Sequence, residues 1–376
     1  MKELFINVRR RRSGNGGDSP PSRVAVKEKA STKQRAVSVA YGFYKGLVVL
    51  SALIVAAYIG VHLFMKAPEQ KTLPPSQNET AYPGPNSGAA SGADGSAAAP
   101  VGPPEIPLTR RDGVYTVFLT ATDAGGSLTD TMMLLCYDTV QQTVGVVSIP
   151  RDTLVARESG NPHLVYGKGG VQGRIEDVSN MLGIPIDGYV KVNIKGFITL
   201  VDYLGGVDFY VPCYMNYDDP TQNLSIHYTE GQRKLSGQQA MEVARFRKNN
   251  DGSGYSDIGR TQTQQKLLVA LAKKVLSWGS LTKINGFVEI FNKNVTTDLT
   301  LDNLLYFAGQ AINLDPSASV ETGTLPGRGD GVYHKSTYCY ELDPEGTLEM
   351  VNRLVNPYDR DMTLEDMNLA KAESYM

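Results

Sequence analysis

The sequence predicts an α/β protein: an α-β-α sandwich with a mixed central sheet, preceded by one transmembrane helix and a disordered linker. Strand-like and helix-like segments alternate through residues 109–357, which is typical of a sheet covered by helices. A run of nineteen residues at 46–64 contains no Lys, Arg, Asp or Glu, and is long enough to cross a bilayer. Residues 66–108 are rich in Pro, Gly, Ala and Ser, as in flexible spacers.

The N-terminal part of the chain is expected to anchor the domain at a membrane. Residues 1–45 contain eleven Lys or Arg against three acidic residues, and this basic side precedes the apolar span. The positive-inside rule therefore predicts a cytoplasmic tail at 1–45, a single-pass helix at 46–65 and an extracellular remainder. A cleaved signal peptide is the alternative, since the small residues Ala56 and Ala57 would permit cleavage. The basic tail has no helix-turn-helix pattern, so we expect no nucleic-acid partner.

Local patterns predict the elements of the domain at 109–357. Strands are expected at 114–120, 131–137, 144–149, 188–194 and 207–211, and helices at 175–182, 197–204, 301–314 and 348–355. The second and third strands are almost continuously apolar, which indicates central strands covered on both faces. Gly205 and Gly206 should end the helix before the last strand. The C-terminal tail at 358–376 is weakly patterned, and we expect it to be loose.

Two arginines follow a short helix in the stretch 236–268. Ser236 and Gln239 have the spacing of a capping box for a helix at 238–243. Arg245 and Arg247 are separated by Phe246. Side chains two residues apart share a face only on an extended chain, so we expect an extended segment with Phe246 in the core.

The next helix is polar at its start and apolar further along. Asp257 is expected as its N-cap, and Arg260 and Gln264 lie one turn apart, followed by leucines on nearly the same face. Helix N-termini favour anions, so this surface suits a ligand with a phosphate head and a hydrocarbon tail. An ordinary amphipathic core helix with surface arginines is the alternative.

Two other places carry candidate chemistry. Asp123 and Asp130 lie near the ends of a loop, where carboxylates can hold a hard cation such as Mg²⁺ or can serve as turn and cap residues. Arg151 follows Pro150 at the carboxyl end of a strand, where ligands collect in open α/β sheets, although an ion pair with Asp152 is equally consistent. The histidines and cysteines have neither catalytic nor metal-site spacing, so we predict no covalent nucleophile and expect core thiols.

The order and spacing of these motifs resemble the extracellular domain of LytR-CpsA-Psr proteins, the cell-wall phosphotransferases of mostly Gram-positive bacteria. The resemblance covers most of residues 114–275. It is carried by the segments at 122–123, 129–132, 147–152, 201–207, 244–247 and 257–260, with Gln264-Gln265 after them.

The resemblance implies an LCP-like fold and a Mg²⁺-dependent transferase, with Mn²⁺ as a substitute. Such an enzyme moves a polyprenyl-pyrophosphate-linked anionic glycopolymer, of teichoic-acid or capsule type, onto peptidoglycan and releases polyprenyl phosphate. Cationic groups and a metal stabilise the charge that spreads over phosphate oxygens during such a transfer. The implied roles are phosphate binding by Arg151, Arg245, Arg247 and Arg260, support of substrate or arginines by Gln264, Asp152 and Asp257, and Mg²⁺ binding by Asp123 and Asp130.

Neutral residues replace basic residues that are common in the family at four positions: Ala124, Leu128, Asn161 and Thr263. Loss of one transition-state donor costs about 3 kcal/mol. The alternative hypothesis is therefore a catalytically weak polyprenyl-pyrophosphate binder or scaffold of cell-wall assembly.

Overall fold

The computed structural model describes residues 66–73, 107–122, 129–156, 162–166, 169–221, 224–255, 257–276 and 284–376. The predicted cytoplasmic tail, the predicted membrane span and most of the predicted linker lie outside these residues. Within the described part of the chain, no helix combines the length and the apolar character needed to cross a membrane.

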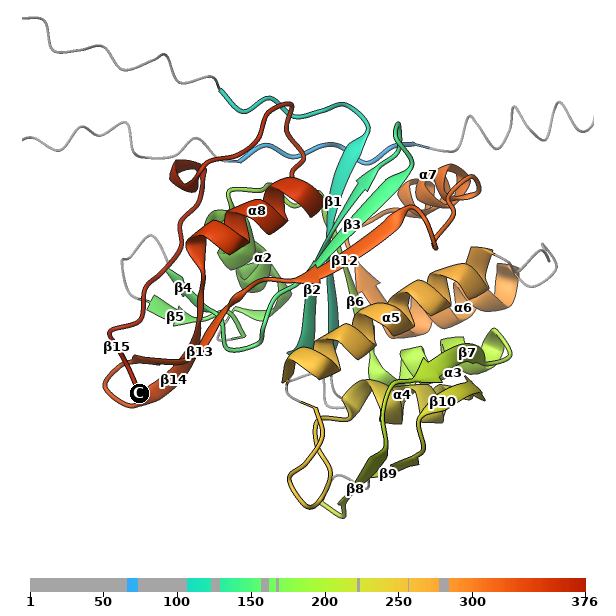
Figure 1. Cartoon of the computed structure of the whole chain (residues 1–376). Coiled ribbons are helices and arrows are strands. Elements are labelled where there is room, and N and C mark those ends of the chain that lie inside the picture. Colours follow the sequence, from blue (N-terminus) through green and yellow to red (C-terminus); the bar gives the residue numbers. More distant parts are fainter. Residues whose placement is uncertain are drawn as a thin grey trace, which may run out of the picture. The chain divides into compact units, whose positions relative to one another are not determined.

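A six-stranded mixed sheet lies at the centre of the domain (Figure 1), with the strand order β11-β6-β1-β2-β3-β12. The strands are β1 (Val114–Thr122), β2 (Thr129–Asp138), β3 (Thr143–Ser148), β6 (Gly188–Asn193), β11 (Val295–Thr297) and β12 (Val320–Thr324). β1 runs parallel to β6 and β3 parallel to β12, whereas β2 runs antiparallel to both β1 and β3. The predicted α/β fold with a mixed sheet is confirmed.

Helices cover both faces of this sheet. α2 (Gly170–Leu182) and α8 (Pro344–Leu354) pack on one face, and α5 (Asp257–Leu276) and α7 (Leu301–Ala311) contact the other. Met133 and Leu134 are neighbours in β2, yet they belong to different apolar clusters because successive side chains of a strand point to opposite faces. Burial on both faces explains why this strand is almost continuously apolar in the sequence.

A second group of elements packs beside the sheet around its own apolar cluster. It comprises α3 (Ile194–Tyr203), β7 (Val207–Val211), β8 (Met215–Asp219), β9 (Leu224–Tyr228), β10 (Gly231–Leu235) and α4 (Gly237–Arg245), and α6 (Ile284–Asn294) contacts α3. As predicted, α3 ends at two glycines in the left-handed region, with φ of 78° at Gly205 and 86° at Gly206. The remaining elements are β4 (Leu154–Ala156), β5 (Pro162–Leu164), β13 (Gly327–Tyr333), β14 (Thr337–Leu342), the 3-10 helix η3 (Leu364–Asp366) and β15 (Ser374–Tyr375).

The C-terminal tail packs on the domain, so the prediction of a loose tail is wrong. Tyr358 and Met362 are buried in the main core, and β15 pairs with β13. The Tyr358 hydroxyl also donates a hydrogen bond to the Gly183 carbonyl at 2.8 Å. The sequence did not predict this packing because the apolar side chains of the tail follow no regular period and are held by tertiary contacts.

Residues 66–73 of the predicted linker also contact the domain. The Gln70 side chain donates to the carbonyls of Arg111 at 2.9 Å and Val114 at 2.7 Å, and the Lys71 amide donates to the Asp187 carboxylate at 2.7 Å. Asp187 is buried, and it also forms an ion pair with Arg110 at 2.8 Å. The first residues of the predicted spacer therefore belong to the folded unit.

Candidate functional site

A cavity of about 210 Å³ lies at the carboxyl ends of the parallel strands β3 and β12. The last residues of these strands, Ser148 and Thr324, pair in register and line the cavity, together with Thr131 from the neighbouring β2. Ligands bind at this edge of the sheet in open α/β proteins. The full lining is Thr131, Met132, Ser148, Ile149, Pro150, Arg151, Asp152, Arg247, Ile258, Arg260, Thr261, Gln264, Thr324, Gly329, Tyr338, Cys339 and Tyr340.

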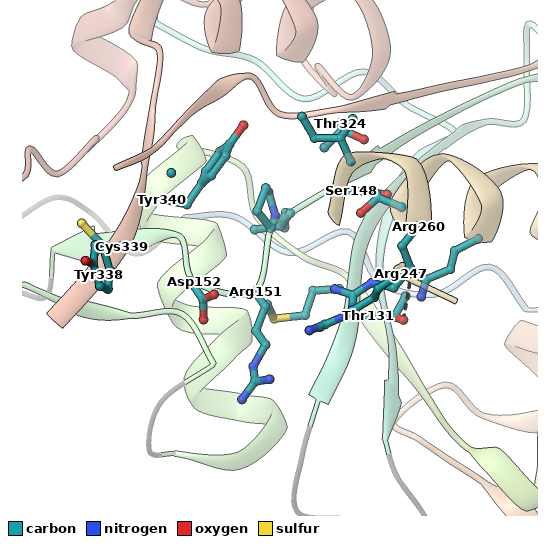
Figure 2. Close-up of a pocket in the computed structure, with 17 residues that line it drawn as sticks. Thr131, Ser148, Arg151, Asp152, Arg247, Arg260, Thr324, Tyr338, Cys339 and Tyr340 are labelled. Carbon is teal, nitrogen blue, oxygen red and sulfur yellow. Dashed lines mark hydrogen bonds between the residues drawn. The ribbon is translucent and has the colours of Figure 1, made fainter. Parts of the chain in front are cut away.

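Three of the four predicted arginines, Arg151, Arg247 and Arg260, line this cavity, and they come from three separate segments. Figure 2 shows Arg247 and Arg260 grouped near Thr131, with Arg151 lying between them and the strand that carries Tyr338. Arg260 is 7% exposed and lies in the first turn of α5. The cavity is therefore cationic and lies beside a helix N-terminus, which together favour an anion.

Arg151 reaches the cavity from a turn that follows β3. β3 ends at Ser148, and the carbonyl of Pro150 accepts hydrogen bonds from the Thr153 amide at 3.1 Å and the Thr153 hydroxyl at 2.7 Å. Asp152, the predicted partner of Arg151, leaves the same turn and also lines the cavity. The turn thus fixes the backbone from which both charged side chains project.

Arg245 and Arg247 were predicted to share one face of an extended segment, but the structure places them differently. The predicted capping box is present, with the Gln239 amide donating to the Ser236 hydroxyl and the Ser236 amide donating to the Gln239 side chain. Phe246 is extended (φ −60°, ψ 132°) and 2% exposed, as predicted. Arg245, however, is the last residue of α4 and is absent from the cavity lining, whereas Arg247 lines the cavity. The helix runs two residues longer than expected, so the shared face of an extended chain does not apply to Arg245.

The segment carrying Arg247 is joined to α5 by a close aromatic contact. The ring of Tyr255 packs edge-on against Phe246, with centroids 5.8 Å apart and planes at 90°. A Cβ at Gly259 would lie 1.8 Å from a ring carbon of Tyr255, so glycine at this position permits the approach. This contact holds Arg247 near the start of the helix that bears Arg260.

Two consecutive glutamines join α5 to the rest of the site. Gln264 lines the cavity as predicted, but its amide oxygen accepts from Thr131 at 3.1 Å and its amide nitrogen donates to the Ala244 carbonyl at 3.1 Å. Gln265 is 4% exposed and donates to the Ser148 hydroxyl at 2.8 Å, to the Gly323 carbonyl at 2.6 Å and to the Thr324 hydroxyl at 3.2 Å. Sequence reasoning missed the role of Gln265, and the only available signal was the Gln-Gln pair itself.

The predicted metal ligands are described incompletely. Asp123 lies outside the described residues, and Asp130 and Asp257 are described only as the second residue of β2 and the first residue of α5. Asp257 is thus the first residue of the helix, whereas the sequence predicted it as the N-cap. Within the described residues, no three His, Cys, Asp or Glu side chains are grouped as metal ligands would be. Asp130 directly precedes Thr131, which lines the cavity.

The positions that depart from the family pattern lie partly outside the described chain. Ala124, Leu128 and Asn161 are outside the described residues. Thr263 is 3% exposed, and its hydroxyl lies 3.4 Å from the Tyr255 hydroxyl. Thr263 is therefore packed inside the domain and is not among the residues that line the cavity.

The C-terminal third supplies a side of the cavity that the sequence did not predict. Gly329, Tyr338, Cys339 and Tyr340 line it, and the Tyr340 amide donates to the Asp152 carbonyl at 2.7 Å. This bond attaches β14 directly to the turn that bears Arg151. No local sequence signal marks a contact between residues so distant along the chain.

The three cysteines are unpaired, in agreement with the prediction of thiols. Cys136 and Cys339 are buried, and Cys213 is half-buried. Burial raises the pKa of the Cys136 thiol to about 12 and raises the pKa of the other two thiols. A raised pKa disfavours the reactive thiolate.

Comparison with known proteins gives a consistent family match. The sequence model of the LytR_cpsA_psr family matches residues 104–356. The polyisoprenyl-teichoic acid–peptidoglycan teichoic acid transferase TagV of Bacillus subtilis (strain 168) is 31% identical over 246 residues, covering 63% of this chain and 61% of TagV. The corresponding transferase TagU of Bacillus anthracis is 32% identical over 257 residues, covering 66% of this chain and 80% of TagU. The match therefore spans less than two thirds of TagV.

Solved structures share the same fold. The crystal structure of B. subtilis TagV has a TM-score of 0.55 and 25% sequence identity, covering 64% of this chain and 95% of that structure. A structure of TagT bound to LIIa-WTA has a TM-score of 0.52 and 23% identity, covering 66% of this chain and 92% of TagT, and supports the fold alone.

Proposed function

The chain belongs to the LytR_cpsA_psr family, and we propose that it is a glycopolymer transferase. In this proposal it moves a polyprenyl-pyrophosphate-linked anionic glycopolymer, of teichoic-acid or capsule type, onto a peptidoglycan hydroxyl and releases polyprenyl phosphate. The observation that carries the proposal is the convergence of Arg151, Arg247 and Arg260 on one cavity. The names of TagV and TagU, which are teichoic acid transferases, support the polymer class.

The size and charge of the cavity suit a diphosphate. Its volume of about 210 Å³ is below that of typical pockets for drug-sized ligands, at roughly 300–1,000 Å³. A compact head group therefore fits, whereas a whole lipid does not. Guanidinium groups bind phosphate oxygens through two parallel hydrogen bonds, and three of them would stabilise the charge that develops on those oxygens during transfer.

The lipid tail would lie between the sheet and its two outer helices. Leu268 of α5 and Phe307 of α7 pack against Met133 and other apolar side chains on that face of the sheet. None of the residues of α7, all of which are described, is buried, so this helix packs less closely than α2 or α8. A small outward displacement of α7 would open an apolar channel behind the arginines.

Asp123 and Asp130 remain our proposed Mg²⁺ ligands, with Mn²⁺ as a substitute. Asp130 adjoins Thr131 of the cavity lining, and carboxylate oxygens are the donors that Mg²⁺ prefers. When bound, the ion would supply additional positive charge to the phosphate oxygens. Removal of divalent ions by EDTA should abolish turnover and readdition of Mg²⁺ should restore it; turnover that persists in EDTA contradicts this part of the proposal.

The proposed location follows from the charge asymmetry of the N-terminal residues. With residues 1–45 in the cytoplasm and residues 46–65 in the membrane, the domain would face the cell wall, where peptidoglycan is available as the acceptor. Protease accessibility of the domain in intact protoplasts tests this orientation.

The central test measures polyprenyl phosphate release from a lipid-pyrophosphate-linked glycopolymer in the presence of peptidoglycan fragments. Arg247→Ala should reduce the turnover number about 10²- to 10³-fold, because it removes one donor to the transition state. Arg233→Ala is the matched control, since Arg233 lies on β10 and donates to the Thr229 carbonyl outside the cavity. Equal turnover in both variants would contradict the proposal.

The second candidate function is a catalytically weak lipid-pyrophosphate binder or scaffold. It is motivated by the neutral residues at Ala124, Leu128, Asn161 and Thr263. Tight binding of the lipid donor by the wild-type protein, lost in Arg247→Ala but accompanied by no polyprenyl phosphate release, would favour this candidate.

A further inference from the structure

We propose that Tyr166 is a positioning residue for Arg151, and that the buried Arg174 fixes Tyr166 in turn. The proposal rests on the proposed function, because it concerns how one of the phosphate-binding arginines is held. Tyr166 is absent from the cavity lining, whereas Arg151 is part of it, so Tyr166 would act only through Arg151.

The backbone holds Tyr166 beside the turn that bears Arg151. β4 follows this turn and pairs antiparallel with β5, which ends at Leu164. The next residue, Val165, donates its amide to the Thr153 carbonyl at 2.9 Å. Tyr166 therefore emerges directly opposite the turn, although it lies fifteen positions after Arg151 in the chain.

The guanidinium group of Arg151 lies over the ring of Tyr166. The central carbon of the Arg151 guanidinium lies 4.6 Å from the centroid of the Tyr166 ring, well within the range of about 6 Å for a cation–π contact. An arginine side chain has many rotamers and loses conformational entropy when it is fixed. The contact with the ring therefore limits the positions that the guanidinium can take beside the cavity.

Arg174 supports Tyr166 from the first half of α2. It is 7% exposed, and its side chain donates to the Tyr166 carbonyl at 3.4 Å. Desolvation lowers the pKa of Arg174, and the charge of Asp177 opposes this shift. Asp177 is itself 4% exposed and lies 2.8 Å from the His163 ring. Because Arg174 is buried, its hydrogen bond helps to hold the Tyr166 carbonyl in place.

A purely structural role for Tyr166 is the competing explanation, because its ring also packs against a small apolar cluster that includes Leu154 and Tyr333. Two substitutions separate the explanations. Tyr166→Leu keeps much of the apolar volume and removes the aromatic face, whereas Tyr166→Phe keeps the aromatic face and removes the hydroxyl.

Nuclear magnetic resonance of the full-length protein tests the contact between Arg151 and Tyr166, and this measurement does not depend on enzymatic activity. The Arg151 side-chain protons should be shifted upfield by the ring in the wild-type and Tyr166→Phe proteins, and this shift should vanish in Tyr166→Leu. An unchanged Arg151 shift in Tyr166→Leu would overturn the proposal, whatever the fate of the proposed function.

Affinity for inorganic pyrophosphate tests the consequence. Tyr166→Leu should weaken binding about three- to thirtyfold, the range expected for loss of a cation–π contact, and Tyr166→Phe should stay within about twofold of wild type. In turnover assays the Michaelis constant for the lipid donor should rise more than the turnover number falls. Equal losses in both variants, or a loss in Tyr166→Leu that only parallels a lower melting temperature, would overturn the positioning role.

Coupling to Arg174 is tested by a double-mutant cycle with pyrophosphate affinity as the readout. Arg174→Gln should weaken binding, and adding it to Tyr166→Leu should weaken binding no further, since both changes act through the same side chain. Additive losses would overturn the link between Arg174 and Tyr166. A wild-type protein that binds pyrophosphate but releases no polyprenyl phosphate would contradict the proposed function and leave these comparisons valid.

Discussion

Replacement of Gln265 by leucine should destabilise the domain and lower its activity. The side-chain nitrogen of Gln265 is buried and lies within 3.2 Å of three acceptors on β3 and β12. It carries two protons, so two bonds are lost at about 1 kcal/mol each, and the half-buried Gly323 carbonyl loses a partner at about 1–3 kcal/mol. Apolar burial of leucine offsets part of this cost, which leaves about 3 kcal/mol.

Thermal unfolding of the full-length protein in detergent measures this effect. For a domain of this size, about 3 kcal/mol corresponds to a decrease of about 6–12 °C in the melting temperature. Turnover should fall about tenfold or more, because Gln265 holds the helix that carries Arg260 and small displacements of catalytic groups are costly. Gln238→Leu is the matched control, since the exposed Gln238 on α4 donates to Glu242, on the same helix, at 2.8 Å. Equal melting temperatures of the Gln265→Leu and Gln238→Leu proteins would refute the reasoning.

Three further predictions concern other parts of the structure. Asp187→Ala should destabilise the domain by about 3–5 kcal/mol in urea unfolding, because it leaves the largely buried Arg110 guanidinium without its ion-pair partner at 2.8 Å. Phe307→Glu should abolish binding of the lipid-linked donor and leave pyrophosphate affinity unchanged, because a carboxylate would enter the apolar layer behind the cavity. In the folded protein near pH 9, a thiol-alkylating reagent should modify Cys213 before Cys136, because Cys136 is buried and burial raises its pKa to about 12. The pKa of the Cys136 thiol is higher in the folded state than in the unfolded state, where it is about 8.5. Its contribution to stability is therefore complete below pH 8.5 and is lost as the pH rises toward 12.

The predictions for Asp187, for Phe307 and for the stability effect of Cys136 each have a control and an outcome that would count against them. Asp208→Ala, at an exposed position of β7, should leave the unfolding free energy within about 0.5 kcal/mol of wild type, and an equal effect of Asp187→Ala would show that the buried pair contributes little. Phe307→Leu should retain donor binding; donor binding by Phe307→Glu would place the lipid elsewhere. Cys136→Ala should show a weaker loss of stability between pH 9 and 11 than wild type, and identical pH profiles would contradict the buried-thiol argument.

Local sequence patterns were sufficient to predict the main strands of the sheet and some of the residues of the site. β1, β3 and β7 lie within two residues of the predicted strands at either end. Burial of Phe246 and the capping box of Ser236 were predicted correctly, because each depends on residues within one helical turn. Arg151 lines the cavity three residues after the end of β3, at the carboxyl edge of the sheet, a position that the chain order alone indicates.

Tertiary contacts decided the composition of the site. Arg245 is the last residue of α4 and is not among the residues that line the cavity, and Gln264 forms hydrogen bonds with Thr131 and Ala244. Such outcomes depend on which side chains meet in space, and the sequence carries no signal for that.

The sequence by itself determined that this protein is an α/β domain with arginines at a strand end, beside a short helix and in the first turn of another helix. Only the tertiary structure decided that three of those arginines share one cavity, that Gln265 fixes the helix behind them, and that Tyr340 from the C-terminal third is bonded to the Arg151 turn. The physical reason is range: periodicity and capping act between residues a few positions apart, whereas a binding cavity is formed by packing between segments that are far apart along the chain.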